Sequence, residues 1–543
     1  MLALTLAWAG PATAAHLRQP ASIPMRDGAA LAADVYVPAA VGAWPVVLIQ
    51  TPYDKRRFVD TFTGPDADPF LNSPEYAFVV LDWRGFFASA GAAASDADRG
   101  LDGYDAVEWI AAQPWCDTRV ATWGASALGK VQFDTAAIRP PHLAACVPVV
   151  AHMREEYALY YPGGIWARNK NTFVSLYFGG GALLRAHPLD DLVWTVAEAA
   201  SPQPEAIDVP MLHVSGWYDH QAAISLRSLA EIRERGGPRA REHQSALVGP
   251  WTHGGIGDEQ QGELAYPAAA GEASRIIKAF LDHEVRGIAN GWPDRPAVRF
   301  FQINEDAWFG SDVWPPAAVS PATRFLTAAG ELADAPPPTG AAPVRWISDP
   351  AHPVPTVFGA VLLATGGAVQ GPGDLRAVEA RGDVRTFTTE VLEAPLRIQG
   401  QAVARLWVSA AAVDVDLMVR LTEVMPDGRS ILIVDGARRA SLRGGYTSRA
   451  WLTPGQPVEV EVDLPPVAVT IPAGHRLRAL VAAANFDRYD RNMQDGSAIS
   501  DEPGATATPA EVTMLVDADH PSALDLPVAV ALHLVRRRLT AVR

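Results

Sequence analysis

Short apolar runs alternate with longer amphipathic segments between residues 45 and 253. The runs are apolar at consecutive positions, which is typical of parallel strands covered on both faces of a sheet. Residues 102–113 have apolar positions at helical spacing, and Asp102 is the expected N-cap. This strand–helix alternation predicts a doubly wound α/β domain. The six predicted strands are 45–51, 77–83, 119–126, 143–150, 209–217 and 245–251.

The alternation breaks in two places. An aromatic-rich, helical stretch separates the fourth and fifth strands, as an insertion folded over the end of a sheet would do. A further helix is predicted over 271–288, after the last strand. Beyond residue 320, apolar and polar residues alternate between Gly, Pro and Asp turns, which predicts an antiparallel two-sheet sandwich or jelly roll. The predicted parts are a first α/β segment (16–151), a short helical cap (152–205), a second α/β segment (206–320) and a jelly-roll domain (321–543).

Composition narrows the set of partners. Hydrophobic residues make up 49% of the 543 residues and charged residues 20%, as in folded globular proteins. The formal net charge of −16 argues against nucleic acids and anionic membrane surfaces as partners. After the N-terminal segment, no stretch approaches the ~20 apolar residues that a membrane span needs. Composition therefore leaves a small molecule as the expected substrate, with no nucleic acid partner and no membrane span.

The first fifteen residues are an apolar run that ends in small residues, with an A-x-A pattern at Ala12 to Ala14. These features predict a secretory signal peptide over 1–15 and hence export to the periplasm or the medium, although a basic n-region is missing. The alternative is a wrongly assigned start codon in front of a cytoplasmic protein.

The chain has two cysteines, Cys116 and Cys146. An even number in an exported chain allows a disulfide. Cys146, however, lies in an apolar run, where a thiol often serves as a small core residue. No cysteine or histidine pairing has zinc-ligand spacing, so no metal site is predicted.

Ser126 is the candidate nucleophile, because it follows a predicted strand and precedes a predicted helix. A serine on such a tight turn exposes its hydroxyl beside free helix amides. The turn needs small neighbours, which Gly124, Ala125 and Ala127 provide. The general pattern requires glycine two places after the serine, whereas Leu128 stands there and Gly129 follows it.

An acid and a base follow Ser126 in the order that this fold uses. Asp219 ends the predicted strand 209–217 in the segment GWYD, and His253 ends the strand 245–251 in GPWTH. A serine hydroxyl becomes nucleophilic when a histidine takes its proton and a carboxylate orients that histidine. Three such residues at three strand ends predict a catalytic triad. His220, next to Asp219, is expected to line the substrate pocket.

Several segments resemble the cocaine-esterase-like (CocE/NonD) hydrolases, a family that is related to Xaa-Pro dipeptidyl-peptidases and α-amino-acid ester hydrolases. The resemblance covers nearly the whole chain after residue 15. Its segments are IPMRDGAALAADVYVP, TPYDK, DWRG, DGYDAVEWIAAQPW, WGASALG, GWYD, GPWTH, DVRTFTTEVLEAPLRIQGQAVARLWVSA and FDRYDRNMQDG.

The resemblance implies an α/β-hydrolase core, a helical cap and a C-terminal jelly roll. It implies a nucleophile within G-x-S-x-x-G, which matches Ser126, and an acid and a base that match Asp219 and His253. It also implies an oxyanion hole formed by the Tyr53 hydroxyl and the Ala127 amide. The DWRG residues Asp82 and Arg84 also match family positions and are interpreted as structural residues that hold the loop after the strand.

Three features depart from the family pattern. Ala127 replaces the usual tyrosine after the nucleophile, so the pocket wall lacks an aromatic ring. Gln221 and Ala222 occupy the places where α-amino-acid ester hydrolases carry acids that bind the substrate ammonium group, which argues against an amino-acid ester role. The cap is also short. We expect His220 and Trp166 to contact the substrate.

The leading hypothesis is therefore a serine hydrolase that cleaves carboxylic esters through an acyl-enzyme on Ser126. A peptide or amide hydrolase of the Xaa-Pro dipeptidyl-peptidase type is the first alternative, although no carboxylate for a free N-terminus is identifiable. A non-catalytic binding protein that uses the jelly roll is the second. No cofactor is expected, because the triad chemistry needs none.

Overall fold

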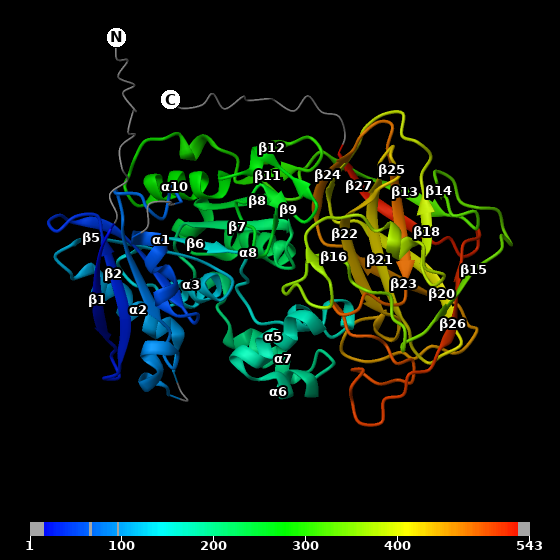
Figure 1. Ribbon diagram of the computed structural model, residues 1–543, viewed down its shortest axis with the longest axis horizontal. Helices are drawn as coiled ribbons and strands as arrows, with labels where there is room; N and C mark the ends of the chain where they lie inside the picture. Colours follow the sequence, from blue (N-terminus) through cyan, green and yellow to red (C-terminus); the bar gives the residue numbers. More distant parts are fainter. Residues whose placement is uncertain (1–15, 64–67, 95–96, 530–543) are drawn as a thin grey trace, which may run out of the picture.

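The computed structural model describes residues 16–63, 68–94 and 97–529, so the predicted signal peptide lies outside the described residues. Figure 1 shows an α/β part, coloured blue to green, beside an all-β part, coloured green through yellow to red. The predicted α/β core and the predicted C-terminal all-β domain are both confirmed. The jelly-roll connection of the second domain stays a prediction.

The α/β part is built on a ten-stranded sheet in the order β1-β2-β4-β3-β5-β6-β7-β8-β11-β12. The strands from β4 to β11 in this order run parallel, and antiparallel pairs close both edges. All six predicted strands are present within a few residues of their expected bounds. The strands are β1 Leu17–Pro24, β2 Ala30–Val37, β3 Trp44–Thr51, β4 Ala77–Asp82, β5 Cys116–Ala125, β6 Leu143–Val149, β7 Met211–Tyr218, β8 Gln244–Thr252, β11 Val298–Gln302 and β12 Ala307–Ser311.

Helices cover both faces of this sheet, with α10 on one face and α2, α3 and α8 on the other (Figure 1). Continuous burial along β4 and β7 explains why these strands lack polar alternation. The helices of the α/β part are α1 Val59–Thr63, α2 Arg99–Ala111, α3 Ala127–Ala137, α8 Ala222–Arg235, α9 Pro238–Glu242 and α10 Glu272–Glu284. The helix predicted over 271–288 is thus shorter than expected.

The predicted N-cap of α2 is wrong. Asp98, not Asp102, caps the helix, because its carboxylate accepts hydrogen bonds from the Gly100 and Leu101 amides at 2.7 and 3.2 Å. Asp102 lies in the first turn, and Arg84 binds its carboxylate. Four aspartates at positions 96, 98, 102 and 105 precede the buried apolar residues of this helix, so sequence spacing alone did not identify the cap.

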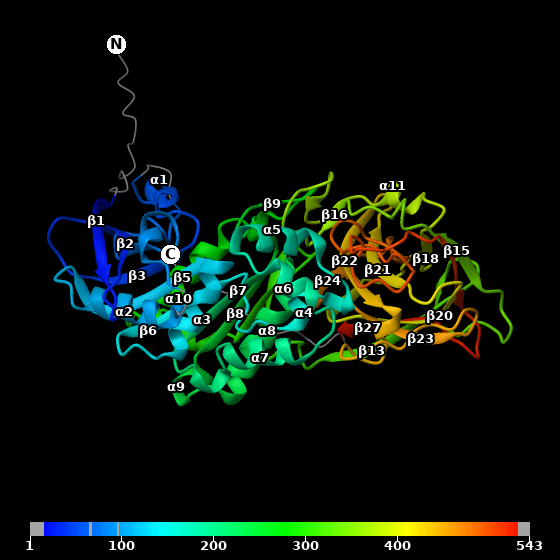
Figure 2. The same ribbon diagram turned by 90° about the horizontal axis from the view of Figure 1, so that it is seen from below.

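The cap joins β6 to β7 and consists of short helices, α4 Tyr157–Tyr160, α5 Arg168–Phe178, α6 Gly181–Ala186 and α7 Leu192–Ala200. Figures 1 and 2 both place these helices at the junction between the α/β sheet and the β domain. Aromatic rings form the core of the cap. Its buried members are Tyr157, Tyr161, Trp166 and Trp194, together with Ile499 from the C-terminal domain.

The C-terminal domain contains a nine-stranded and a four-stranded sheet, both antiparallel. Backbone hydrogen bonds at Ile303 link the end of β11 to β24, so the two domains share one continuous core. The strands are β13 Val319–Leu326, β14 Leu332–Ala333, β15 Val344–Ser348, β18 Arg385–Thr388, β19 Leu396–Gly400, β20 Val403–Ala410, β21 Asp416–Val424, β22 Ser430–Arg439, β23 Val458–Asp463, β24 Val467–Ile471, β25 Arg476–Ala482, β26 Ala510–Leu515 and β27 Ala523–Ala529. Smaller elements are β9 Gln260–Gln261, β10 Leu264–Ala265, β16 Phe358–Gly359, β17 Val369–Gln370 and α11 Arg376–Glu379.

Two further sequence predictions concern the cysteines and the membrane. Cys116 and Cys146 are both free and buried, so the disulfide alternative is wrong. Burial raises the pKa of the Cys116 thiol to about 11 and that of the Cys146 thiol to about 12, as expected for core residues. Among the described residues, no helix is long and apolar enough to cross a bilayer.

The buried ion pair of Arg84 and Asp102 generates a stability prediction. Their side chains are 5% and 9% exposed, and the guanidinium donates two hydrogen bonds to the carboxylate at 2.6 and 2.9 Å. Replacing Arg84 with Met leaves a buried carboxylate without its cation, so the free energy of unfolding should fall by about 3–5 kcal/mol in a urea titration. Arg26→Met removes the partly exposed pair with Asp105 and should cost about 1 kcal/mol or less. Equal losses would contradict a structural role for Arg84.

Candidate active site

Ser126 occupies the sharp turn between β5 and α3. Its backbone has φ 58° and ψ −119°, a combination that non-glycine residues rarely adopt. The Ser126 amide donates to the Val149 carbonyl at 2.9 Å, and the Ser126 carbonyl accepts from the Gly129 and Lys130 amides. Backbone hydrogen bonds on both sides thus hold the strained turn, which presents the serine at the start of a helix.

The structure explains why glycine stands at 129 instead of 128. A Cβ added to Gly129 would lie 2.6 Å from Ala151 Cβ and 3.0 Å from the Gly124 and Val149 carbonyl oxygens. Leu128 is buried and covers Gly124, where an added Cβ would lie 2.4 Å from Leu128 Cβ. The close approach that requires glycine is therefore made one residue later than the general serine-turn pattern expects.

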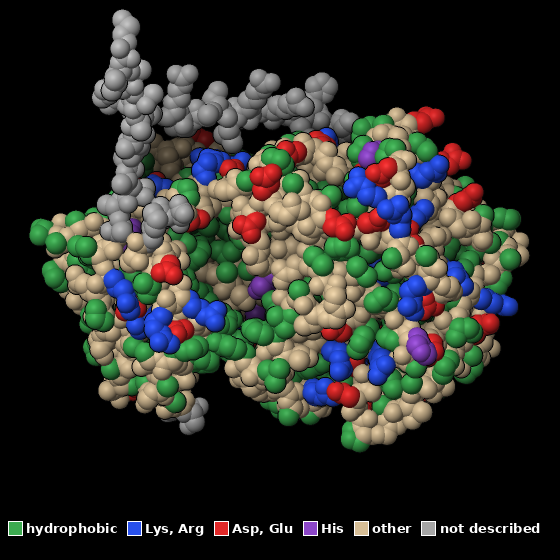
Figure 3. Space-filling view, in the orientation of Figure 1, with side chains coloured by type: hydrophobic (Ala, Val, Ile, Leu, Met, Phe, Trp, Pro, Cys, Tyr) green, Lys and Arg blue, Asp and Glu red, His purple; other side chains and the backbone are tan. Residues whose placement is uncertain are grey.

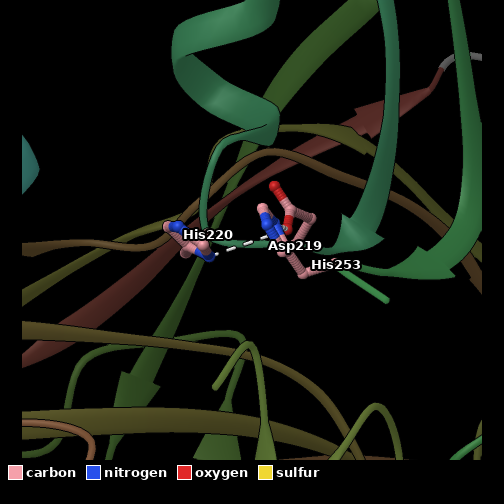
Figure 4. A group of neighbouring side chains, drawn as sticks. All are labelled: Asp219, His220 and His253. Atoms are coloured by element: carbon pink, nitrogen blue, oxygen red, sulfur yellow. Dashed lines mark hydrogen bonds and ion pairs between the residues drawn. The ribbon is translucent and has the colours of Figure 1, made fainter. Parts of the chain in front are cut away.

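Asp219 and His253 meet because they follow paired residues of adjacent parallel strands. Tyr218 of β7 pairs with Thr252 of β8, and each strand ends there. Asp219 Oδ2 lies 2.6 Å from His253 Nδ1, and Asp219 Oδ1 accepts from the Gln221 amide at 2.7 Å. Figure 4 shows the acid and the two histidines together. Asp219 and His253 thus form an acid–base pair in which the carboxylate is fully buried.

The environment of Asp219 keeps it ionised. Burial disfavours the charged carboxylate, but the neighbouring His253 and His220 together with the hydrogen bonds outweigh it, and the pKa of Asp219 is lowered. An ionised Asp219 accepts the hydrogen bond from His253 Nδ1, which leaves Nε2 as the proton acceptor. Within the described residues, Ser126 Oγ and His253 share no hydrogen bond, and such bonds often tighten only when substrate binds.

His220 approaches the same carboxylate oxygen as His253, with Nδ1 3.6 Å from Asp219 Oδ2 and its ring 4.9 Å from the His253 ring. Burial lowers the pKa of His220 to about 3, so the ring is neutral. One ligand atom from each of Asp219, His220 and His253 lies within 4.8 Å of the others, a spacing that a metal ion could use. The 2.6 Å hydrogen bond between two of them instead matches an acid–base pair.

Tyr53 and the Ala127 amide lie beside Ser126. Burial raises the pKa of Tyr53 to about 12, although a hydrogen bond with the Ser126 side chain acts in the opposite direction. Tyr53 therefore stays protonated and keeps a donor hydrogen. Ala127 is the first residue of α3, where a backbone N–H has no acceptor within the helix. The Tyr53 ring packs at 5.2 Å from Tyr177 of the cap, which fixes its position.

The sequence analysis also named Asp82 as a structural residue and Trp166 as a substrate contact. Asp82 accepts hydrogen bonds from the Lys55 and Ala88 amides, so it holds the loop that carries Tyr53. Trp166 is 2% exposed and packs 5.2 Å from Tyr161 in the aromatic core of the cap. Trp166 is not among the residues that line the cavity beside His220, and it borders a second cavity together with Arg168 and Arg185.

That cavity has a volume of about 410 Å³ and is walled by the cap, α8 and the C-terminal domain. Figure 3 shows histidine side chains in a hollow near the centre of the face drawn. Sequence reasoning missed Lys170 and Arg488, which line the cavity. The only signal for Lys170 is a cation within an aromatic-rich insertion, and nothing in the sequence links Arg488 to the cap.

Comparisons with known proteins agree with this fold. Residues 27–199 match the family model of the X-Pro dipeptidyl-peptidase (S15 family), and residues 290–525 match that of the X-Pro dipeptidyl-peptidase C-terminal non-catalytic domain. A cocaine esterase from Rhodococcus sp. (strain MB1 Bresler) is 32% identical over 93% of this chain and 97% of its own length.

Two solved structures share the architecture. An aminopeptidase from a marine sediment Thaumarchaeota archaeon is 23% identical with a TM-score of 0.83 and covers 97% of this chain and 99% of its own. An α-amino acid ester hydrolase is 24% identical with a TM-score of 0.81 and covers 96% and 98%. Fold and relatives together define the class: this protein is a serine hydrolase. The chain belongs to the cocaine-esterase (CocE/NonD) family of hydrolases.

The position of the glycine after the nucleophile generates a second prediction. Gly129→Ala should slow labelling of the protein by a fluorophosphonate at least about 10-fold, since displacing a reacting group by about 1 Å can cost 100-fold. Gly382→Ala is the matched control, because an added Cβ there has no atom within 4 Å and the backbone is not left-handed. Labelling is measured by intact-protein mass spectrometry. Equal rates for the two variants would show that the turn tolerates a side chain at 129.

Proposed function

We propose that this protein hydrolyses carboxylic esters through an acyl-enzyme on Ser126. The observation that carries the proposal is the buried Asp219–His253 pair, with 2.6 Å between Oδ2 and Nδ1, on the same edge of the sheet as the strained Ser126 turn. The Rhodococcus relative, named a cocaine esterase, supports ester cleavage as the reaction.

The proposed reaction has two halves. Ser126 Oγ attacks the ester carbonyl carbon while His253 Nε2 takes the hydroxyl proton, and Asp219 stabilises the imidazolium that forms. The tetrahedral intermediate collapses, and His253 returns the proton to the departing alcohol oxygen. Water then attacks the acyl-enzyme with His253 as its base, which releases the acid and restores Ser126.

Charge that develops on the carbonyl oxygen needs two donors. The Tyr53 hydroxyl and the Ala127 N–H supply them in the proposal, because both lie beside Ser126 and neither donor is used up in a helix or a strand. Because its pKa is about 12, Tyr53 stays a neutral donor throughout the pH range of an ordinary assay.

Peptide hydrolysis is the second candidate, because both family models carry the name of X-Pro dipeptidyl-peptidases. Such an exopeptidase needs a carboxylate for the substrate N-terminus. Near the cavity, Glu155 accepts from the Tyr160 hydroxyl at 2.7 Å and lies 3.7 Å from Lys130 Nζ, and Glu156 is paired with Arg227. Both acids already have partners, which favours esters over N-terminal peptides.

The first test compares p-nitrophenyl esters with an Xaa-Pro p-nitroanilide on the purified full-length protein. Hydrolysis of the esters should exceed that of the anilide, and Ser126→Ala should lower kcat by about 10⁴-fold or more. Ser89→Ala serves as the control, since this buried serine braces a loop and contacts no proposed catalytic group. Faster turnover of the anilide, or ester cleavage that survives Ser126→Ala, would contradict the proposal.

The second test concerns the oxyanion. Tyr53→Phe should lower kcat for esters by about 100-fold with little change in KM, because the lost donor acts on charge that develops in the transition state. Tyr104→Phe on α2 should leave kcat unchanged. A loss that appears in KM alone would mean that Tyr53 binds substrate rather than the oxyanion.

A further inference from the structure

Lys170 on α5 differs from the other charged side chains around the cavity. Among residues 16–63, 68–94 and 97–529, no carboxylate lies within ion-pair distance of the Lys170 Nζ, and no partner hydrogen-bonds to that nitrogen. Its contact is the face of the Tyr160 ring, with Nζ 4.4 Å from the centroid. A cation in such a position is left with donors that a ligand can use.

The other charges that face the cavity are compensated. Arg488 forms an ion pair with Asp435, and Glu156 forms one with Arg227. Glu155 is the carboxylate whose charge acts on the pKa of Lys170 and raises it. The Glu155 carboxylate is already engaged by the Tyr160 hydroxyl, by His152 at 3.5 Å and by Lys130 at 3.7 Å. Of the charged side chains that line the cavity, Lys170 is therefore the one without an ion pair among the described residues.

The cavity reaches the proposed catalytic site at His220, the one residue of that group that lines it among the described residues. His220 forms part of its wall, and the His220 ring lies 4.9 Å from the His253 ring. The charge of Lys170 contributes to the lowered pKa of His220, so the two are close enough to interact. Aliphatic side chains make up other parts of the wall, among them Ile224 and Leu362. At about 410 Å³, the space fits a small organic group.

We propose that this cavity binds a carboxylate on the substrate through Lys170, so that the preferred substrates are esters that carry one free carboxylate. The proposal rests on the ester hydrolysis proposed above. One cation without an ion pair, beside aliphatic side chains, matches one negative charge on a short hydrocarbon chain, because a second buried charge would have no partner. The substrate carboxylate then supplies the ion-pair partner that Lys170 does not have among the described residues.

Kinetics with matched esters provide the main test. One pair is p-nitrophenyl hydrogen glutarate and p-nitrophenyl glutaramate, which differ only in carboxylate against carboxamide on the acyl group. The other is 4-acetoxybenzoate and 4-acetoxybenzamide, which differ in the same way on the alcohol. In at least one pair, wild-type kcat/KM should favour the anion by about 10- to 100-fold, the range expected for a charged hydrogen bond.

Lys170→Met should abolish that preference, and Lys170→Arg should keep part of it. Lys278→Met is the matched control, because Lys278 lies on α10 in an ion pair with Asp282. The control should keep the wild-type preference. An absence of preference in the wild type for both pairs would overturn the proposal, as would a preference that Lys170→Met leaves intact.

The pH dependence gives a readout that a merely structural lysine would not change. Burial lowers the pKa of Lys170 to about 8, so the anion preference of the free enzyme should fall as pH rises through 8. The surrounding groups keep their charge in this range. Burial lowers the pKa of His220 to about 3 and raises that of Tyr160 well above its ordinary value, while nearby cations hold the pKa of Glu155 far below its ordinary value. Arg488, paired with Asp435, stays charged, and its pKa is raised. A preference that is constant from pH 7 to 9.5 would contradict the role of Lys170.

Calorimetry separates this proposal from the proposed function. Glutaramate, which carries one carboxylate, should bind the wild type at least about 10-fold more tightly than neutral glutaramide, and Lys170→Met should remove the difference. If none of the four esters is cleaved, ester hydrolysis fails, and the glutaramate titration still decides the carboxylate site. If Lys170→Met does not fold, the wild-type comparison of glutaramate with glutaramide decides it alone. Equal binding of the two compounds would overturn the proposal.

Discussion

The hydrogen bond between Asp219 and His253 depends on how closely β7 and β8 approach each other at their ends. A Cβ added to Gly216 of β7 would lie only 2.0 Å from the Trp251 carbonyl oxygen of β8. Any side chain at 216 would therefore push the strands apart just before the acid and the base. The register shifts between Gly216 and Tyr218, and this irregularity aligns Tyr218 with Thr252. One glycine and one irregularity thus set the 2.6 Å contact.

The position of the site follows from parallel strand order. The carboxyl ends of parallel strands meet at one edge of a sheet, and the loops after β3, β5, β7 and β8 carry Tyr53, Ser126, Asp219 and His253. The cap begins after β6, which lies between β5 and β7 in the sheet. An insertion at that strand has to emerge in the middle of the catalytic edge. The cap and the C-terminal domain can therefore wall the cavity beside His220 without disturbing the sheet.

Sequence patterns predicted the features that depend on burial and on the order of residues along the chain. They missed the features that depend on the direction in which a side chain points. The parallel strands were recognisable because both of their faces are buried, and Asp219 and His253 were recognisable because they end such strands. Aromatic residues of the cap gave no sign of which ring faces the cavity, and Trp166 packs inside the cap instead. The N-cap at Asp98 and the free cysteines depend on distances between side chains, which spacing along the chain does not encode.

Charge acts on two scales in this protein. The formal net charge of −16 sets the field that a distant macromolecule meets, and this field falls off within about 8 Å in physiological salt. A ligand inside the cavity meets local charges instead, where water is largely excluded and screening is weak. There, Asp219 accepts a hydrogen bond from His253 and Arg488 is paired with Asp435, while Lys170 has no ion-pair partner among the described residues. An acidic protein can therefore present a cation to a small ligand, and its net charge says little about the charge of a small substrate.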